Sequence, residues 1–281
     1  MIGEYWKLTK PRITTLVAAT ACIGFYLGGG AMRSNRLFFC LAGTALASAA
    51  AGALNQYLER KRDGLMRRTA GRPLPRGRID PVHAAIFGVS CAVLGLGLLS
   101  WKVNGLAGVI AGLTLFFYLA LYTPFKTRTP HSTWIGAVAG AAPPLIGWAG
   151  ASGRLSSEAW VLFAIQFLWQ IPHFMSLFWL YREDYARAGF RVMPVVDPAG
   201  KTTSCQIALH SFALLPASLM PTFCGMAGTP YGCGALTLGA AFLGLGMRAS
   251  WTMNALDTRR LFLASLAYLP LLLGMLVVGR T

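Results

Sequence analysis

The residues with the most evident chemistry form a row of oxygen-bearing side chains at positions 55, 59 and 63. Asn55, Glu59 and Asp63 are spaced four residues apart. On one α-helix they therefore lie along one face, each about 6 Å above the last. An amide oxygen and two carboxylates are hard ligands of the kind that Mg²⁺ prefers, in sites that it shares with waters and substrate phosphates. If this segment is helical, the row predicts a metal site.

The loop that follows the row supplies positive charge. Arg67, Arg68 and Arg72 come within the next nine residues after Asp63, and Pro73 stops any further helix. Guanidinium groups pair well with phosphate oxygens. Metal-binding acids followed by these arginines suggest a diphosphate site. A second interpretation stays open, in which the acids only pair with neighbouring arginines at a solvated helix end.

The elements that must position these residues are long apolar runs. Of the 281 residues, 55% are hydrophobic and 12% charged, and a soluble domain carries about 25% charged residues. A helix needs roughly 20 apolar residues to cross a bilayer core. Nine runs meet that length: 13–31, 36–58, 82–101, 105–122, 133–151, 159–181, 204–226, 232–250 and 260–279. We expect an all-α, polytopic membrane protein, a bundle of nine transmembrane helices that forms a single domain over residues 1–281.

The distribution of charge predicts the orientation. The net charge of +16 does not indicate a nucleic-acid partner, because the basic residues lie in short bursts between apolar runs, as in a protein of the lipid bilayer. With the N-terminus inside, 20 of the 25 Lys and Arg residues fall on the inner side, as the positive-inside rule requires. Eight of the nine acidic residues also fall there. We therefore expect the chemistry to face the cytoplasm.

The six cysteines give little evidence of a function. They include no C-x-x-C pair, and most lie within apolar runs, where a thiol behaves as a small hydrophobe. Cys224 and Cys233 flank a short outer loop, so a disulfide between them stays open.

The segment from Asn55 to Leu74 resembles the first signature of the UbiA superfamily of intramembrane prenyltransferases, N-x-x-x-D-x-x-x-D. Within the superfamily it is most similar to the protoheme IX farnesyltransferases, the haem O synthases. Glu59 replaces the first aspartate and keeps its charge on a longer side chain. The resemblance implies that the row of three binds Mg²⁺ and acts in catalysis. It also implies that the diphosphate contacts include three arginines: Arg67, Arg68 and Arg72.

A second inner loop, from Tyr122 to Thr129, resembles the Tyr-Thr…Lys-Arg loop of the same superfamily. The resemblance implies that Lys126 is a catalytic residue that contacts the diphosphate. Arg128 lies one position later than the usual arginine and is a further candidate. The loop leads into Pro143-Pro144, which we expect to break a membrane helix beside a cavity or other protein.

The run Trp169-Gln170-Ile171-Pro172-His173-Phe174 closely resembles the haem O synthases. Trp169 and His173 are four residues apart, so they stack on one helix face, an arrangement that suits a flat porphyrin. We expect both to bind haem. Whether His173 binds the iron, contacts a propionate or moves a proton stays open. Asp184 matches the second acidic motif of the superfamily, which implies a catalytic metal ligand there, although Tyr181 replaces the preceding aspartate.

The resemblance implies that the chain transfers a farnesyl group from farnesyl diphosphate to the vinyl group of haem B. Haem O and diphosphate are the products, Mg²⁺ is the cofactor, and a haem A synthase is a candidate partner. The bacterial cytoplasmic membrane is the expected location. Two alternatives stay open: a UbiA-type transferase that acts on a quinone precursor, which the Trp-Gln-x-Pro-His-Phe run disfavours, and a membrane transporter.

Overall fold

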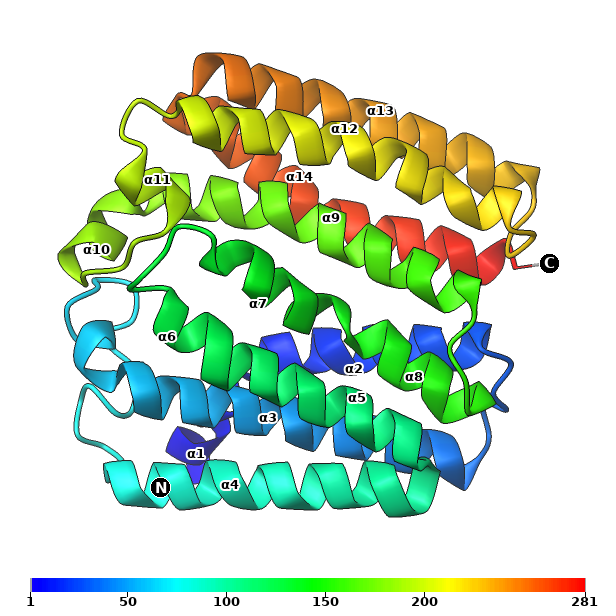
Figure 1. Ribbon diagram of the computed structural model, residues 1–281, viewed down its shortest axis with the longest axis horizontal. Helices are drawn as coiled ribbons and strands as arrows, with labels where there is room; N and C mark the ends of the chain where they lie inside the picture. The colour runs from blue at the N-terminus through cyan, green and yellow to red at the C-terminus, as the bar shows by residue number, and fades with distance from the viewer. Residues whose placement is uncertain (1, 281) are drawn as a thin grey trace.

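The computed structural model describes residues 2–280, and it is almost entirely helical. The first and last residues of the expected domain lie outside this described part. Figure 1 shows long helices running side by side, with short helices at one end of the bundle. The elements in chain order are α1 (Ile2–Leu8), α2 (Pro11–Leu27), α3 (Asn35–Asp63), α4 (Pro81–Leu98), η1 (Leu99–Val103), α5 (Gly105–Phe116), η2 (Phe117–Tyr122), α6 (Thr123–Phe125), α7 (Ser132–Ala141), α8 (Pro143–Ser152), α9 (Ser157–Leu180), α10 (Arg182–Arg187), α11 (Met193–Val196), α12 (Lys201–Phe223), α13 (Thr229–Thr252) and α14 (Ala255–Val278). The elements η1 and η2 are π-helical turns.

Each predicted apolar run falls mainly on one helix or on consecutive helices, although runs such as 13–31 extend past the helix end. Among the described residues, six helical segments are long and apolar enough to cross a membrane. They are Asn35–Asp63, Pro81–Val103, Gly105–Phe125, Ser157–Leu180, Thr229–Thr252 and Ala255–Val278. The other three runs correspond to α2, which is shorter, to the broken pair α7 and α8, and to α12. The structure thus supports a multi-pass membrane protein, and the count of nine spans stays a prediction.

Helix α3 continues past the predicted end of its apolar run, to Asp63. Its N-terminus is capped by Ser34, whose Oγ accepts a hydrogen bond from the Leu37 amide at 3.2 Å. Its last turn carries three basic residues, which favour the negative end of the helix dipole. The row of oxygen-bearing side chains is therefore helical along its whole length.

The predicted break at the two prolines separates α7 from α8. Because Pro144 has no amide hydrogen, it cannot bond to the carbonyl of Gly140. That carbonyl instead accepts a hydrogen bond at 2.8 Å from the side-chain amide of Gln166 in α9. A polar side chain from a neighbouring helix thus satisfies the freed backbone group, as the interior of a membrane protein requires.

Helices α2 and α8 pack with their backbones in contact. A Cβ atom on Gly24 of α2 would overlap the carbonyl of Pro144, and one on Gly147 of α8 would overlap the carbonyl of Ala21. Small residues at such crossings let membrane helices approach closely. This contact holds α2 against α8, the second helix of the pair that the prolines break.

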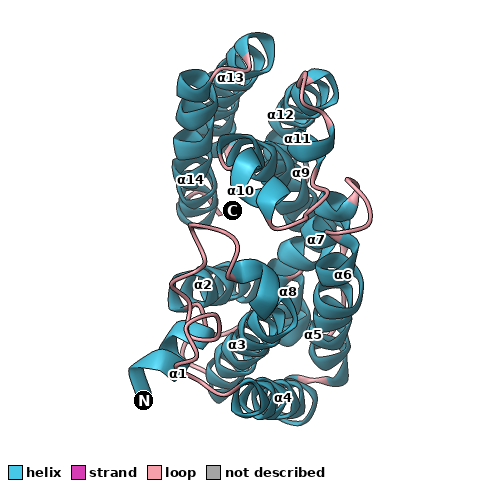
Figure 2. Ribbon diagram, turned by 90° about the vertical axis from the view of Figure 1, so that its left-hand side faces the viewer, coloured by secondary structure: helices cyan, strands magenta, loops and turns pink. Residues whose placement is uncertain are grey.

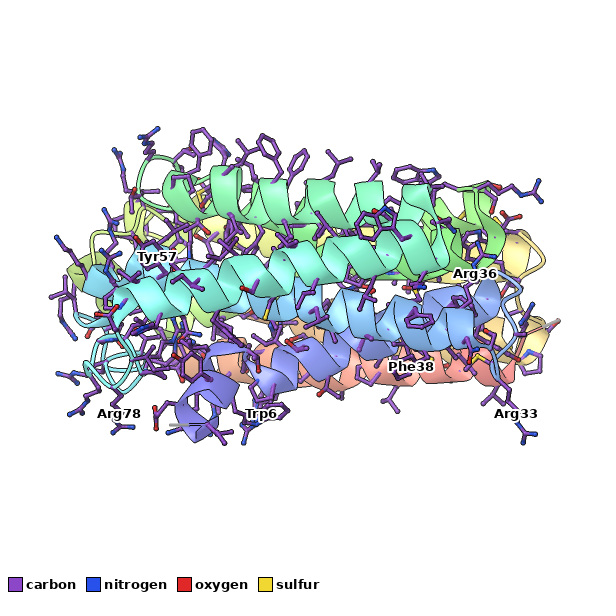
Figure 3. All side chains as sticks on the ribbon, turned by 90° about the horizontal axis from the view of Figure 1, so that it is seen from below. Trp6, Arg33, Arg36, Phe38, Tyr57 and Arg78 are labelled. Carbon is purple, nitrogen blue, oxygen red and sulfur yellow. The ribbon has the colours of Figure 1, made fainter. Side chains whose placement is uncertain are left out.

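The outside of the bundle is apolar. Large side chains such as Trp101 and Trp251 are 88% and 90% exposed, as expected where lipid covers the surface. Figure 3 shows Phe38 on this outer surface, with Arg33 at the opposite end of the bundle from Arg78. All six cysteines are free, so the disulfide that the sequence left open does not form.

One end of the bundle carries the C-terminus of α3, the loop 64–80 and the short helix α10, and we call it the charged end. Figure 1 shows α10 and α11 there, with the C-terminus of the chain at the other end. Figure 2 looks along the helices from the charged end.

Replacing Gly147 with alanine should destabilise the bundle, because the backbone of α2 cannot rotate away from the new Cβ atom. Overpacking of this kind costs about 1–3 kcal/mol. Gly274→Ala in α14 is the matched control, since nothing lies within 4 Å of its Cβ position. The measurement is the thermal unfolding midpoint of each variant in detergent. Equal midpoints for the two variants would contradict the close packing of α2 on α8.

Candidate active site

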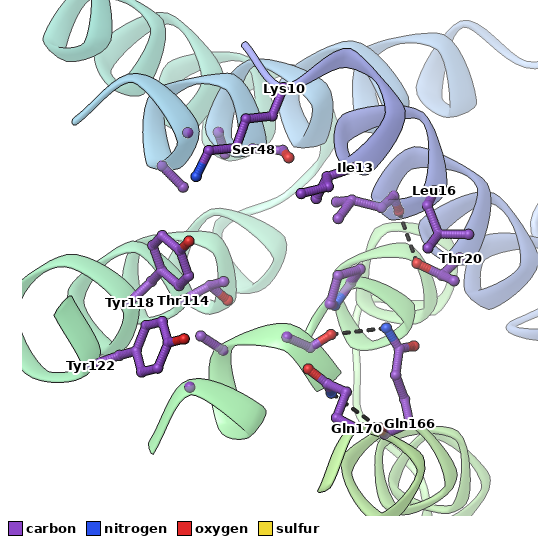
Figure 4. A pocket seen from close by; sticks show the side chains of 18 of the residues that line it. Lys10, Ile13, Leu16, Thr20, Ser48, Thr114, Tyr118, Tyr122, Gln166 and Gln170 are labelled. Atoms are coloured by element: carbon purple, nitrogen blue, oxygen red, sulfur yellow. Dashed lines mark hydrogen bonds between the residues drawn. The ribbon is translucent and has the colours of Figure 1, made fainter. Parts of the chain in front are cut away.

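A cavity of about 400 Å³ lies among α2, α3, α5, α7 and α9 and is lined mostly by apolar side chains. Figure 4 shows Lys10, Tyr118 and Tyr122 reaching into it, and Gln166 and Gln170 at another part of its wall. The two tyrosines belong to the π-helical turn η2. The cavity is therefore apolar in its walls and carries polar groups at a few positions.

The predicted row lies in the last turns of α3, and the structure buries all of it. Asn55, Glu59 and Asp63 are only 2%, 5% and 2% exposed. Carboxylates this deeply buried need partners, because an unpaired buried charge is very costly. Each member of the row does hold one cationic side chain, at 2.5 to 2.9 Å: Lys10 Nζ on Asn55 Oδ1, Lys126 Nζ on Glu59 Oε1, and Arg72 Nη1 on Asp63 Oδ2.

The amide of Asn55 is held in one orientation. Its Nδ2 donates to the hydroxyl of Thr123 at 3.3 Å, and that hydroxyl donates to the carbonyl of Tyr118 at 2.8 Å. The amide oxygen of Asn55 therefore faces Lys10. These contacts also connect the row on α3 to the end of η2.

The charged end has more positive charge than its acids neutralise. Burial, together with repulsion from Arg72, lowers the pKa of Lys10 to about 7. Burial also disfavours the charge on Lys126, but the attraction of Glu59 outweighs it, and the pKa of Lys126 is raised above its usual value. The site therefore suits an anionic ligand, which would stabilise the protonated, positively charged form of Lys10.

The second acidic residue, Asp184, lies in α10 and is 8% exposed. Its carboxylate accepts hydrogen bonds from the backbone amide of Arg68 at 3.3 Å and from the guanidinium of Arg187 at 3.0 Å. The guanidinium of Arg68 donates to the hydroxyl of Tyr185 at 3.1 Å. Arg68 thus fastens the loop 64–80 to α10.

Apolar packing supports the same connection. Met66, in the loop, is buried in a cluster with side chains of α9 and α10 and of the segment after them: Phe178, Tyr185, Ala188, Phe190 and Val192. The amide of Arg191 donates to the carbonyl of Lys126 at 2.7 Å, which joins the second inner loop to this segment. The loops that carry the candidate residues are thus held together at the charged end.

The donor set fits a magnesium ion that arrives with a phosphate ligand. Between residues 2 and 280, no three His, Cys, Asp or Glu side chains are close enough to form a complete metal cage. The two acidic segments instead offer a few hard oxygens each, from the row on α3 and from Asp184. Mg²⁺ is commonly held by one or two carboxylates, with phosphate oxygens and waters completing its shell.

The structure does not bring every predicted cation to the row. Lys126 and Arg72 contact it and Arg68 contacts Asp184, but Arg67 and Arg128 are exposed. Within the described part of the chain, neither of these two side chains pairs with an acidic group.

The predicted stack of Trp169 and His173 is present, with ring centroids 5.0 Å apart and planes at 18°. Both side chains line the cavity. Ser265 of α14 contacts both, since its Oγ lies 2.7 Å from His173 Nδ1 and its carbonyl accepts from Trp169 Nε1 at 2.8 Å. The cavity thus has a charged end and an aromatic wall that includes an imidazole.

Sequence reasoning assigned no role in the site to Lys10, to the two tyrosines of η2 or to Ser265, although Tyr122 was noted as the start of the second inner loop. For Lys10 the sequence contains little signal, because a lysine directly before Pro11 at the start of an apolar helix also fits a solvated helix end. In the structure its backbone is unusual, with a φ of 49°, a conformation that residues with a side chain adopt at an energetic cost. Ser265 gave no signal, since a lone serine in an apolar run is common.

The buried pair of Glu59 and Lys126 makes a prediction about stability. Glu59→Gln or Lys126→Met alone leaves a buried charge unpaired, and each should cost about 3–5 kcal/mol. The double variant removes both charges, so its free energy of unfolding should fall by much less than the sum of the losses in the two single variants. Unfolding of the ligand-free protein in detergent measures this cycle. Additive losses would contradict a direct interaction between the two side chains.

Comparisons with known proteins agree with this architecture. The model of the UbiA prenyltransferase family matches residues 17–271. A protoheme IX farnesyltransferase of Solibacter usitatus is 46% identical over 288 residues, covering 99% of this chain and 98% of the relative.

Two solved structures share the fold at low sequence identity. A digeranylgeranylglyceryl phosphate synthase is 17% identical with a TM-score of 0.81, covering 99% of this chain and 98% of the other. A UbiA homologue from Archaeoglobus fulgidus bound to GPP and Mg²⁺ is 16% identical with a TM-score of 0.61, covering 97% and 99%. Because the family model covers most of the chain and the Solibacter protein is similar over its whole length, this chain belongs to the UbiA prenyltransferase family.

Proposed function

We propose that this protein transfers a farnesyl group from farnesyl diphosphate to a vinyl group of haem B and so makes haem O and diphosphate. The observation that carries the proposal is the position of paired acids and cations at one end of an apolar cavity with an aromatic, imidazole-bearing wall. Such a cavity accommodates a ligand with a charged head and a long apolar chain. The name of the Solibacter relative, protoheme IX farnesyltransferase, supports this choice of substrates.

The charged end is proposed to bind the diphosphate by an exchange of partners. Lys10, Lys126 and Arg72 now pair with the row on α3, and each would turn to a phosphate oxygen when the substrate binds. The oxygens that they leave are the proposed metal ligands: Asn55, Glu59, Asp63 and, from α10, Asp184. Mg²⁺ bound there supplies positive charge that neutralises the leaving diphosphate. The Mg²⁺ and GPP bound to the Archaeoglobus homologue support this role.

The cavity is proposed to control the reaction of the farnesyl group. Departure of diphosphate breaks the C–O bond and leaves an allylic cation, which apolar walls protect from water. Aromatic faces such as those of Tyr118 and Tyr122 attract a cation. The vinyl π electrons then form the new C–C bond, and water adds to the porphyrin-side cation and loses a proton. This sequence yields the hydroxyethylfarnesyl chain of haem O.

The aromatic wall is proposed to hold the porphyrin. Trp169 and His173 line the same cavity as Lys10 and Tyr118, so an acceptor against them shares one space with the farnesyl chain. A quinone precursor would have no need of an imidazole in an otherwise apolar wall. We therefore favour haem B as the acceptor.

We further propose that residues 1–281 form one domain with nine membrane spans and the N-terminus in the cytoplasm. The bias of 20 of the 25 basic residues to one side supports this orientation. With this orientation the charged end, and with it the active site, would lie at the cytoplasmic face of a bacterial inner membrane. The apolar product would stay in the membrane, where a haem A synthase is the proposed partner.

Asp63→Asn should reduce farnesyl transfer by about 100-fold or more, because removal of one group that stabilises transition-state charge has an effect of this size. The assay follows radiolabelled farnesyl diphosphate into haem with and without Mg²⁺, and mass spectrometry identifies the product. Asp80→Asn is the matched control, since this exposed carboxylate caps α4 at the same end of the bundle. An Asp63→Asn enzyme that retains full activity would remove this residue from the site.

The same assay tests the acceptor. Haem B and an aromatic quinone precursor are offered separately to the purified protein together with labelled farnesyl diphosphate. We expect label in the porphyrin only. Label in the quinone precursor would favour the other type of transferase, and label in neither would favour a transporter.

Reporter fusions test the orientation. Alkaline phosphatase is active only outside the cytoplasm, so a fusion after Gly153, between α8 and α9, should be active. A fusion after Gly77, between α3 and α4, should be inactive. The reverse pattern would place the charged end outside.

A further inference from the structure

The hydroxyl of Ser265 lies within hydrogen-bond distance of two groups. It is 2.6 Å from the carbonyl oxygen of Phe262 and 2.7 Å from Nδ1 of His173. A carbonyl oxygen only accepts, so the single hydrogen of the hydroxyl goes to Phe262. With its hydrogen given to Phe262, the hydroxyl accepts from His173. In this arrangement the imidazole carries its hydrogen on Nδ1 and has a bare lone pair on Nε2.

Three aromatic rings keep the imidazole in place. Trp169 stacks on it at 5.0 Å, Phe262 stacks at 5.1 Å with planes at 24°, and Phe174 meets it edge-on at 5.2 Å. The indole of Trp169 is itself fixed by its bond to the carbonyl of Ser265. Ser265 therefore anchors both members of the stack, one through its backbone and one through its side chain.

The other nitrogen of His173 is left available. The Nδ1 edge of the ring faces α14, so Nε2 points away from that helix, and His173 lines the cavity. Within residues 2–280 no hydrogen bond engages Nε2. A neutral imidazole that donates from one nitrogen and offers the other is the usual form of a histidine that ligates a metal.

We propose that Ser265 is a positioning residue that holds His173 in this tautomer, so that Nε2 binds the iron of the haem substrate as an axial ligand. The proposal rests on the proposed function and refines it, because the sequence left three roles open for His173. A nitrogen without hydrogen cannot donate to a propionate. Iron ligation also fixes the porphyrin relative to the cavity, which is what directed attack by one vinyl group requires.

The test is a titration of the detergent-purified full-length protein with ferric haem, followed through the Soret band. The wild type should give the spectrum of imidazole-ligated haem, and His173→Ala should lose it. Ser265→Ala should weaken haem binding about 10- to 100-fold, the usual effect of removing the partner of a ligating histidine. Ser265→Thr should restore binding, because a threonine hydroxyl in a helix can bond to a carbonyl of the preceding turn and still accept from His173.

Ser218→Ala is the matched control. Ser218 and Ser265 are both fully buried, the hydroxyl of Ser218 lies 2.8 Å from that of Tyr268, and its carbonyl accepts from Tyr231 at 2.8 Å. This serine has the same burial and the same kind of contacts but does not touch His173. Its substitution should leave haem binding unchanged.

Metal-free protoporphyrin IX separates ligation from packing. It has the shape of haem but no iron, so Ser265→Ala, which leaves both rings of the aromatic wall in place, should bind it as tightly as the wild type. Equal losses for haem and for protoporphyrin would show that Ser265 only shapes the wall, and this result would overturn the proposal. A wild-type haem titration and spectrum in Ser265→Ala would also overturn it.

Failure of the proposal and failure of the proposed function give different results. If the wild type makes farnesylated haem while Ser265→Ala binds haem normally, only the role of Ser265 is wrong. If the wild type binds haem through His173, with the expected variant effects, but transfers no farnesyl group, the ligation stands and the proposed function is wrong.

Discussion

The structure depends on one constraint, that charges buried among apolar helices must be paired. At the charged end, each oxygen-bearing residue of α3 holds a cation from another segment: Lys10 from the start of α2, Lys126 from the second inner loop, and Arg72 from the loop 64–80. Because each pair joins different parts of the chain, these electrostatic contacts also stabilise the tertiary structure. It brings together the two sets of groups that the proposed metal and diphosphate would require, and the two sets stay paired until a ligand replaces one partner.

This arrangement reconciles the two interpretations that the sequence left open for the row. The acids do pair with basic residues, as a structural interpretation expects, but two of the three partners, Lys10 and Lys126, are distant in sequence, and Lys126 is itself buried. A solvated helix end would pair with exposed neighbours such as Lys61 or Arg62. The burial of the pairs, and not their existence, is what favours a binding site over a surface ion-pair network.

Local patterns in the sequence predicted the parts of the fold that local physics determines. The i, i+4 spacing placed Asn55, Glu59 and Asp63 on one face, and Pro143-Pro144 predicted the break between α7 and α8. The partners of these residues could not be predicted in the same way. Lys10 meets Asn55, and Ser265 meets His173, only because helices far apart in sequence pack together. Long-range contacts of this kind leave no periodic signal. A motif alone also does not give burial: Arg67 and Arg128, which the sequence singled out as diphosphate contacts, are exposed, and their role stays a prediction.

The π-helical turn η2 has a consequence for how such a site can be built. A π turn accommodates one residue more than an α turn, which rotates the chain after it by about 100° relative to an unbroken α-helix. The direction in which the side chains after Tyr122 point is therefore independent of the direction in which the lipid-facing side chains of α5 point. This decoupling lets one helical segment keep an uninterrupted apolar exterior while its end at the charged end of the bundle directs Lys126 toward Glu59. The position of Lys126 can therefore change without disturbing the contact of α5 with lipid.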